Sequence, residues 1–172
     1  MSPAKVAEAL QDYRAKRNFS LTPEPDALNA SSGDAPSFVI QKHDATRLHY
    51  DIRHELNGVL LFWAVPKGPS FDPTDKRLAM GTEDHPLSYV SFEGAIPPKR
   101  YGAGHVIVWD RRTWTPLIDP HAGLQEGKLV IEAGVPASSP ATAMTGPRRC
   151  RRWRATWQRS SSERPGSTPS RW

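Results

Sequence analysis

The clearest pattern in the chain is an alternation of apolar and polar residues between positions 48 and 56. Side chains that alternate in this way point to opposite faces of a β-strand. One face carries the apolar residues Leu48, Tyr50, Ile52 and Leu56, and the other carries the polar residues His49, Asp51, Arg53 and Glu55. The pattern therefore predicts a half-buried strand whose apolar face packs on a core.

The same reading predicts further short strands along the chain. The dipeptide Asn57-Gly58 joins the strand at 48–56 to an apolar run at 59–65, and Asn-Gly between apolar runs is typical of a tight β-hairpin. The other predicted strands are 37–42, 77–81, 106–110, 113–117 and 128–133, with a hairpin through Arg111-Arg112. Apolar residues at helical spacing predict one helix over 3–17. Many short strands separated by turns predict an all-β fold, either an antiparallel barrel or a sandwich.

Composition limits the class of protein. A chain of 172 residues suits one domain with a single core, although only 37% of its residues are hydrophobic and part of it is expected to stay unpacked. The single cysteine, Cys150, cannot form an internal disulfide. No apolar run approaches the roughly 20 residues of a membrane span, and no signal peptide is evident, so we expect a cytoplasmic protein.

The positive charge is concentrated at the C-terminal end. The net charge is +5, but residues 136–172 hold eight Arg and one acidic residue, which leaves 15 basic and 17 acidic residues in 1–135. We therefore divide the chain into an N-terminal helix and arm (1–36), a β-domain (37–133) and an Arg/Pro/Ser-rich tail (134–172). The tail is interpreted as a disordered nucleic-acid-binding arm, with Trp153 and Trp157 stacking on bases, or as an out-of-frame translation.

The polar face of the central strand is a candidate metal site. His49 and Asp51 stand side by side on the strand and can share one divalent metal, with His43 as a third ligand. Arg53 lies on the same face of the strand, and turns are expected to bring three further cations to it, namely Lys67, Arg77 and Lys99 or Arg100. Such a group suits a phosphoryl substrate, whose oxygens need neutralisation, and His85 is a candidate acid with a pKa near 7.

Two other interpretations stay open. Polar residues on a strand are often a plain solvated surface. The spacing His49-x-Asp51 with a distant His85 also fits the facial triad of non-haem iron oxygenases. The number of surrounding cations favours phosphate chemistry.

Residues 9–131 resemble the 3'-phosphoesterase domain of bacterial DNA ligase D. The motifs that carry the resemblance are Tyr13 to Arg17 with Thr22 to Pro25, Gln41 to Asp51, Trp63 to Ser70, Glu83 to Pro86, and Phe92 to Gly94 with Tyr101 to Gly104. The resemblance implies a small closed β-barrel that removes 3'-terminal ribonucleotides and 3'-phosphates, with manganese as the typical metal. It implies that His43, His49 and Asp51 bind the metal. The residues it assigns to the scissile phosphate and the catalytic site are Arg53, His85, Arg77, Lys67, Arg17, Glu24 and Tyr89.

The chain departs from the family pattern in two places. Asn18 stands where the family has Asp, and the family's strand pattern is lost near Ala133. The first change is expected to weaken ribonucleotide removal, and the second to leave the barrel incompletely closed. The metal site lies upstream of the second change.

The sequence therefore predicts a free-standing, metal-dependent phosphoesterase that acts on DNA or DNA–RNA 3' ends in double-strand break repair. The alternative is an inactive module of the same fold that binds DNA ends or a partner. No ligase motif of the Lys-x-Asp-Gly kind occurs in the chain. The partners that the resemblance suggests are a separate DNA ligase, a repair polymerase and the end-binding protein Ku.

Overall fold

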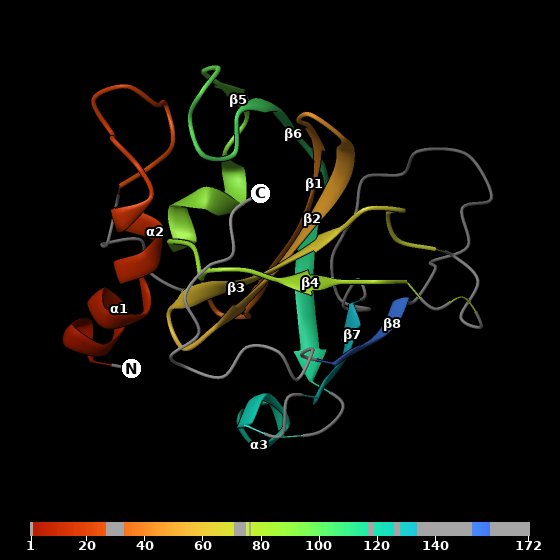
Figure 1. Ribbon diagram of the computed structural model, residues 1–172. Helices are drawn as coiled ribbons and strands as arrows, with labels where there is room; N and C mark the ends of the chain where they lie inside the picture. Colours follow the sequence, from red (N-terminus) through yellow and green to blue (C-terminus); the bar gives the residue numbers. More distant parts are fainter. Residues whose placement is uncertain are drawn as a thin grey trace, which may run out of the picture.

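The computed structural model describes residues 2–26, 33–70, 75, 77–116, 119–125, 128–133 and 153–158. These residues form a structure made mostly of β-strands, which pair antiparallel, with short helices (Figure 1). The elements in chain order are α1 (Pro3–Ala9), α2 (Gln11–Ala15), β1 (Ser37–Asp44), β2 (Leu48–Leu56), β3 (Val59–Val65), β4 (Met80–Gly81), the 3-10 helix η1 (Leu87–Ser91), β5 (Gly94–Ile96), β6 (Gly104–Pro116), α3 (Pro120–Gln125), β7 (Lys128–Ala133) and β8 (Trp153–Gln158). No helix within the described ranges has the length and apolar character that a membrane crossing requires.

The eight strands form one sheet in the order β4-β3-β2-β1-β6-β7-β8, and β5 pairs with β6 outside this path. All the strand pairs are antiparallel. The path is open, since β4 and β8 are not paired with each other in the described part of the chain. The all-β class is therefore confirmed, whereas the closed barrel is not.

The central hairpin follows the sequence pattern closely. β2 and β3 have the predicted bounds, and Leu56 pairs with Val59 across the turn. Asn57 and Gly58 both have positive φ, at 57° and 81°, as a type I′ turn requires. This turn fixes the register of β2 and therefore the face on which each of its side chains lies.

Both faces of the sheet are covered in its central part. One apolar cluster includes Ile52, Val65 and Trp114, and Leu10 of the N-terminal arm packs into it. A second cluster on the other face includes Tyr13, Leu60, Tyr89 and other residues around η1. Figure 1 shows α1 and α2 at the end of the sheet where β3 begins, and the ring of Tyr13 in α2 contacts that of Tyr89 in η1. Of the polar residues of β2, Asp51, Arg53 and Glu55 are consequently buried, and His49 is half-buried.

Three predicted elements differ from the structure. The helix expected over 3–17 is two helices that meet at the buried residue Leu10 and end at Ala15. Only Met80–Gly81 of the strand predicted at 77–81 is paired. The predicted hairpin through Arg111-Arg112 is wrong, because both residues lie within the continuous strand β6 and pair with Val39 and Phe38 of β1.

The segment after residue 133 contains one described element, the strand β8. β7 has the predicted bounds, and β8 pairs with it along its whole length, from Trp153 opposite Ala133 to Gln158 opposite Lys128. A strand thus occurs in the segment that was expected to be irregular. Residues 134–152 and 159–172 lie outside the described residues, so the three-part division of the chain stays a prediction.

Candidate functional site

The register of the β1–β2 hairpin brings three metal-ligating side chains together. His43 of β1 is paired directly with His49 of β2, and Asp51 lies two residues further along β2 on the same face. One ligand atom from each of the three residues lies within 4.8 Å of the others. The grouping of His43, His49 and Asp51 expected from the sequence is therefore present.

Backbone carbonyls orient both imidazole rings. His43 Nε2 donates to the carbonyl of Gly102 at 3.0 Å, and His49 Nδ1 donates to the carbonyl of Arg47 at 2.8 Å. The remaining nitrogens, His43 Nδ1 and His49 Nε2, then carry lone pairs. They lie 3.5 Å and 3.2 Å from the two carboxylate oxygens of Asp51. A carbonyl behind each ring and a lone pair in front is the usual arrangement of metal-binding histidines.

One carboxylate oxygen of Asp51 lacks a hydrogen-bond donor, and a divalent cation would take the place of that donor. Asp51 is buried, and its Oδ1 receives no hydrogen bond despite its short distance to His49. Burial alone would raise the pKa of Asp51, but the two histidines and Arg53 hold it well below its usual range. The facing carboxylate in turn raises the pKa of His49, against the effect of burial. Two nitrogen lone pairs and an ionised oxygen thus converge on one point, which fits a divalent metal.

A buried guanidinium lies next to the metal ligands. Arg53 is 1% exposed, and it donates to Asp51 Oδ2 at 3.0 Å and to Gln41 Oε1 at 2.7 Å. Its guanidinium carbon lies over the rings of Phe62 and Tyr89, 3.9 Å and 4.5 Å from the ring centres. Its Nη1 is buried and has no hydrogen-bond partner. An unpaired guanidinium nitrogen beside a metal site is a binding point for an anion.

Gln41 is a positioning residue that was not singled out from the sequence. Its amide donates to the carbonyls of Phe92 and Tyr89 at 2.8 Å and 3.2 Å, which leaves its oxygen to accept from Arg53. The signal was available, because Gln41 precedes His43 by two residues on the same face of β1.

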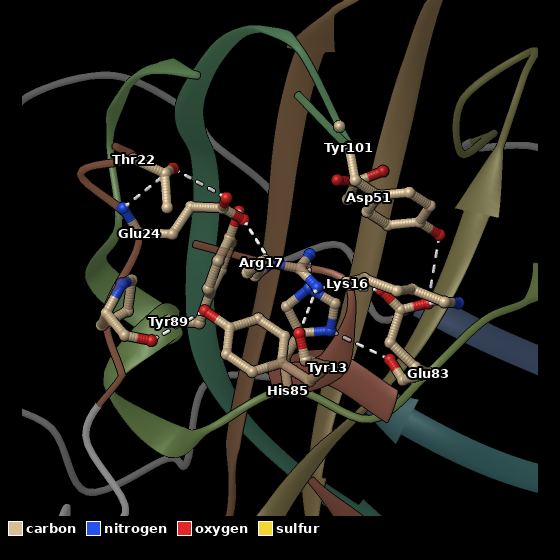
Figure 2. A network of polar contacts seen from close by, with 12 residues as sticks. Tyr13, Lys16, Arg17, Thr22, Glu24, Asp51, Glu83, His85, Tyr89 and Tyr101 are labelled. Atoms are coloured by element: carbon tan, nitrogen blue, oxygen red, sulfur yellow. Dashed lines mark hydrogen bonds and ion pairs between the residues drawn. The ribbon is translucent and has the colours of Figure 1, made fainter. Parts of the chain in front are cut away.

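The N-terminal arm contributes a second polar cluster, centred on Arg17 (Figure 2). Arg17 forms ion pairs with Glu24 at 2.8 Å and with Glu83 at 3.1 Å, and all three side chains are almost fully buried. It also donates to His85 Nε2 at 3.1 Å. Tyr89 connects this cluster to Arg53, because its hydroxyl donates to Glu24 at 3.1 Å while its ring packs on the Arg53 guanidinium. Arg17, Glu24, His85 and Tyr89, all predicted as site residues, thus form one network, and Glu83 is a further member.

His85 differs from the expectation of a pKa near 7. It is 1% exposed, and burial together with the positive charges of Arg53 and Arg17 lowers its pKa well below the usual value. Its Nδ1 donates to the carbonyl of Glu83, so Nε2 accepts the hydrogen bond from Arg17. His85 is therefore a neutral acceptor in this arrangement, not a proton donor.

The remaining predicted residues lie outside these two clusters. Lys67 is exposed and has no ion pair among the described residues. Arg77 pairs with Asp75 at 2.8 Å. Asn18 is exposed, and its side-chain oxygen accepts from the backbone amide of Ser20, a bond that an aspartate would also make.

Comparisons with known proteins show which family the sequence resembles. A family model described as "DNA Ligase D 3'-phosphoesterase domain" matches residues 41–135. The "Multifunctional non-homologous end joining protein LigD" of Pseudomonas aeruginosa is 55% identical over 125 residues, which are 72% of this chain and 15% of that protein. The "Multifunctional non-homologous end joining DNA repair protein LigD" of Mycobacterium tuberculosis is 50% identical over 124 residues, which are 70% of this chain and 16% of that protein. The chain thus spans only about one sixth of the length of these curated relatives.

Proposed function

Because the chain belongs to the DNA ligase D 3'-phosphoesterase domain family, we propose that it hydrolyses phosphoester bonds at the 3' ends of DNA strands. The substrates are a 3'-phosphate and a 3'-terminal ribonucleotide, and the product is a 3'-hydroxyl end. The setting is non-homologous end joining, as the names of the relatives suggest. A DNA ligase, a repair polymerase and Ku are the proposed partners, in the cytoplasm.

The observation that supports the proposal is that two buried polar atoms of one site have no hydrogen-bond partner. Asp51 Oδ1 lacks a donor where two nitrogen lone pairs converge, and Arg53 Nη1 lacks an acceptor nearby. A divalent cation would satisfy the first and a phosphoryl oxygen the second. We propose Mn²⁺ as the cation. When bound, it would act as a Lewis acid on the phosphoryl group.

The residues of the chain have separate roles in this proposal. Arg53 donates from Nη1 to a phosphoryl oxygen, and its two other hydrogen bonds hold it in place before substrate arrives. His85 and Glu24 hold Arg17 at the edge of the same site. Tyr89 presents its ring to Arg53 and its hydroxyl to Glu24. Lys67 and Arg77 are proposed to add positive charge along the bound strand.

The test is release of phosphate from a 3'-phosphate primer-template in the presence of Mn²⁺. We expect turnover by the wild type and none by His49→Ala, because that variant loses a metal ligand. The matched control is His121→Ala, since His121 is an exposed histidine of α3 outside the site. Equal activity of His49→Ala and the wild type would exclude this metal site.

A second outcome distinguishes the alternative function. Folded wild-type protein that binds the primer-template in a salt-dependent way, but releases no phosphate at any metal concentration, would be a DNA-end-binding module. The side chain of Asn18 is exposed and is bonded to the backbone of Ser20 in the described structure, which favours the active enzyme, because an aspartate at this position would make the same contact.

A further inference from the structure

Tyr101 is an exposed aromatic residue at the edge of the site that the reaction itself does not use. It lies in the loop of residues 97–103, which connects β5 to β6, and 48% of it is exposed. Among the described residues, the large exposed aromatic side chains are Tyr101 and Trp109. The partly exposed ring of Tyr101 lies beside the candidate active site, where a ligand bound at that site can reach it.

The loop joins Tyr101 directly to a metal ligand. The residue after it, Gly102, provides the carbonyl that holds His43 Nε2 at 3.0 Å. The hydroxyl of Tyr101 donates to Glu83 at 3.2 Å, the same carboxylate that pairs with Arg17 (Figure 2). Tyr101 therefore stands between the metal ligands and the Arg17 cluster and contacts both groups through hydrogen-bonded neighbours.

The ring is held in one place. Lys16 Nζ lies 4.9 Å from its centre, and the guanidinium carbon of Arg17 lies 5.3 Å away. The backbone of the loop is closed by hydrogen bonds from Arg100 to Pro97 and from Ala103 to Arg100. At the end of the loop, a Cβ on Gly104 would lie only 2.5 Å from the carbonyl oxygen of Asp44, so the loop packs tightly on the tip of the β1–β2 hairpin. A fixed ring binds a flat partner with little loss of conformational entropy.

Two cations precede the ring in the chain. Lys99 and Arg100 are exposed, with no ion pair among the described residues. Lys99 also has a positive φ of 63°, a conformation that costs energy for a residue other than glycine and that is often found at functional sites. Aromatic rings flanked by cations are the usual surface for unpaired nucleotides, because the bases stack and the phosphates pair with the cations.

We propose that the ring of Tyr101 stacks on the base of the nucleotide that carries the reacting 3'-phosphate, with Lys99 and Arg100 beside the phosphates of the preceding nucleotides. This inference rests on the proposed function and names the part of the substrate that the protein grips. Stacking on one face of any base is independent of sequence, so the site accepts all four 3'-terminal nucleotides.

The experiment measures kcat and KM for two primers that end in a 3'-phosphate, one with a normal terminal base and one with an abasic terminal residue. Tyr101→Ala is expected to raise KM for the normal primer about ten- to a hundredfold, the effect typical of one stacked base, with a smaller change in kcat. For the wild type, KM is expected to be higher for the abasic primer than for the normal primer by the same factor. On the abasic primer, Tyr101→Ala and the wild type should have the same KM. Tyr101→Phe should restore most of the lost affinity, because it keeps the ring and removes only the hydroxyl.

Trp109→Ala is the matched control. Trp109 is 46% exposed, and its ring contacts Tyr50, which alternates with His49 and Asp51 and so lies on the opposite face of the sheet. An unchanged KM of Tyr101→Ala for the normal primer would overturn the inference. An equal increase in the KM of Tyr101→Ala for both primers would also overturn it, because that result would indicate a displaced loop. If Tyr101→Ala fails to fold, equal KM values of the wild type for the two primers would overturn it instead. Absence of wild-type turnover would refute the proposed function, and is distinguishable from these results.

Discussion

His54 is a buried histidine that no function described above requires. It is 0% exposed, and neither of its ring nitrogens has a hydrogen-bond partner. Its ring packs among those of Phe38, Trp63 and Trp114, with centres 4.9 to 5.7 Å apart. Burial lowers its pKa from the ordinary value of 6.5 to about 3. The residue is therefore a neutral ring in an apolar environment, and it opposes folding in acid.

The first prediction concerns His54→Phe. Below pH 6.5 the unfolded chain binds a proton at His54 and the folded chain does not until about pH 3, so this residue makes stability fall as the pH falls through that window. At pH 5 the loss amounts to about 2 kcal/mol. His54→Phe removes this loss, and we expect a larger gain in the free energy of unfolding at pH 5 than at pH 8, measured by urea denaturation. An equal difference between the two proteins at both pH values would contradict the assignment.

At the scale of elements, the N-terminal arm is attached to the sheet by a few strong contacts. Leu10 fills the first apolar cluster and Tyr13 the second. Between the arm and the loop before η1, Arg17 pairs with the buried carboxylates of both Glu24 and Glu83, and Lys16 also pairs with Glu83 at 3.0 Å. Removal of Arg17 leaves the buried carboxylate of Glu24 with no ion pair among the described residues.

The second prediction follows from this arrangement. Arg17→Ala is expected to reduce the free energy of unfolding by about 3 kcal/mol or more and to increase hydrogen exchange in α1 and α2. The control is Arg14→Ala, whose ion pair with Asp26 is exposed and should contribute less than about 1 kcal/mol. Similar losses in the two variants, measured by urea unfolding, would show that the buried network does not hold the arm.

The elements also show what the sequence can and cannot predict. Alternation and the Asn57-Gly58 turn are local signals, and they gave β2 and β3 correctly. Arg111-Arg112 resembles a turn in the sequence, but pairing with Val39 and Phe38 of β1 keeps it extended. Alternation assigns residues to two faces without saying what covers each face, so the burial of Arg53 was not predictable from it. The ion pair of Arg17 with Glu83 joins positions 66 residues apart, a distance that no local pattern spans.

At the scale of the whole molecule, the candidate metal site is linked to the stability of the sheet. Its three ligands come from β1 and β2, which are both in the middle of the strand order. An ion held by both strands resists their separation. Any ligand that binds the folded state alone stabilises it in proportion to the logarithm of its concentration.

The third prediction is a thermal shift with Mn²⁺. At a metal concentration 100 times the dissociation constant, the gain is about 2.7 kcal/mol, which is about 5 to 10 °C in Tm for a chain of this size. We expect the shift in the wild type and in His121→Ala, its loss in His49→Ala, and its reversal by a chelator. A shift of the same size in His49→Ala would place the bound metal elsewhere.

The carbonyl groups behind the two histidines have a consequence for the divergence of the family. Every amino acid at position 47 has a carbonyl, so substitution of Arg47 leaves the support of His49 in place. Position 102 is less tolerant, because Gly102 has a φ of 74° that other residues adopt with strain. A metal centre whose ring orientations depend on main-chain atoms survives extensive drift in the side chains around it. A substitution at position 102 should therefore disturb the orientation of its histidine more than a substitution at position 47 does.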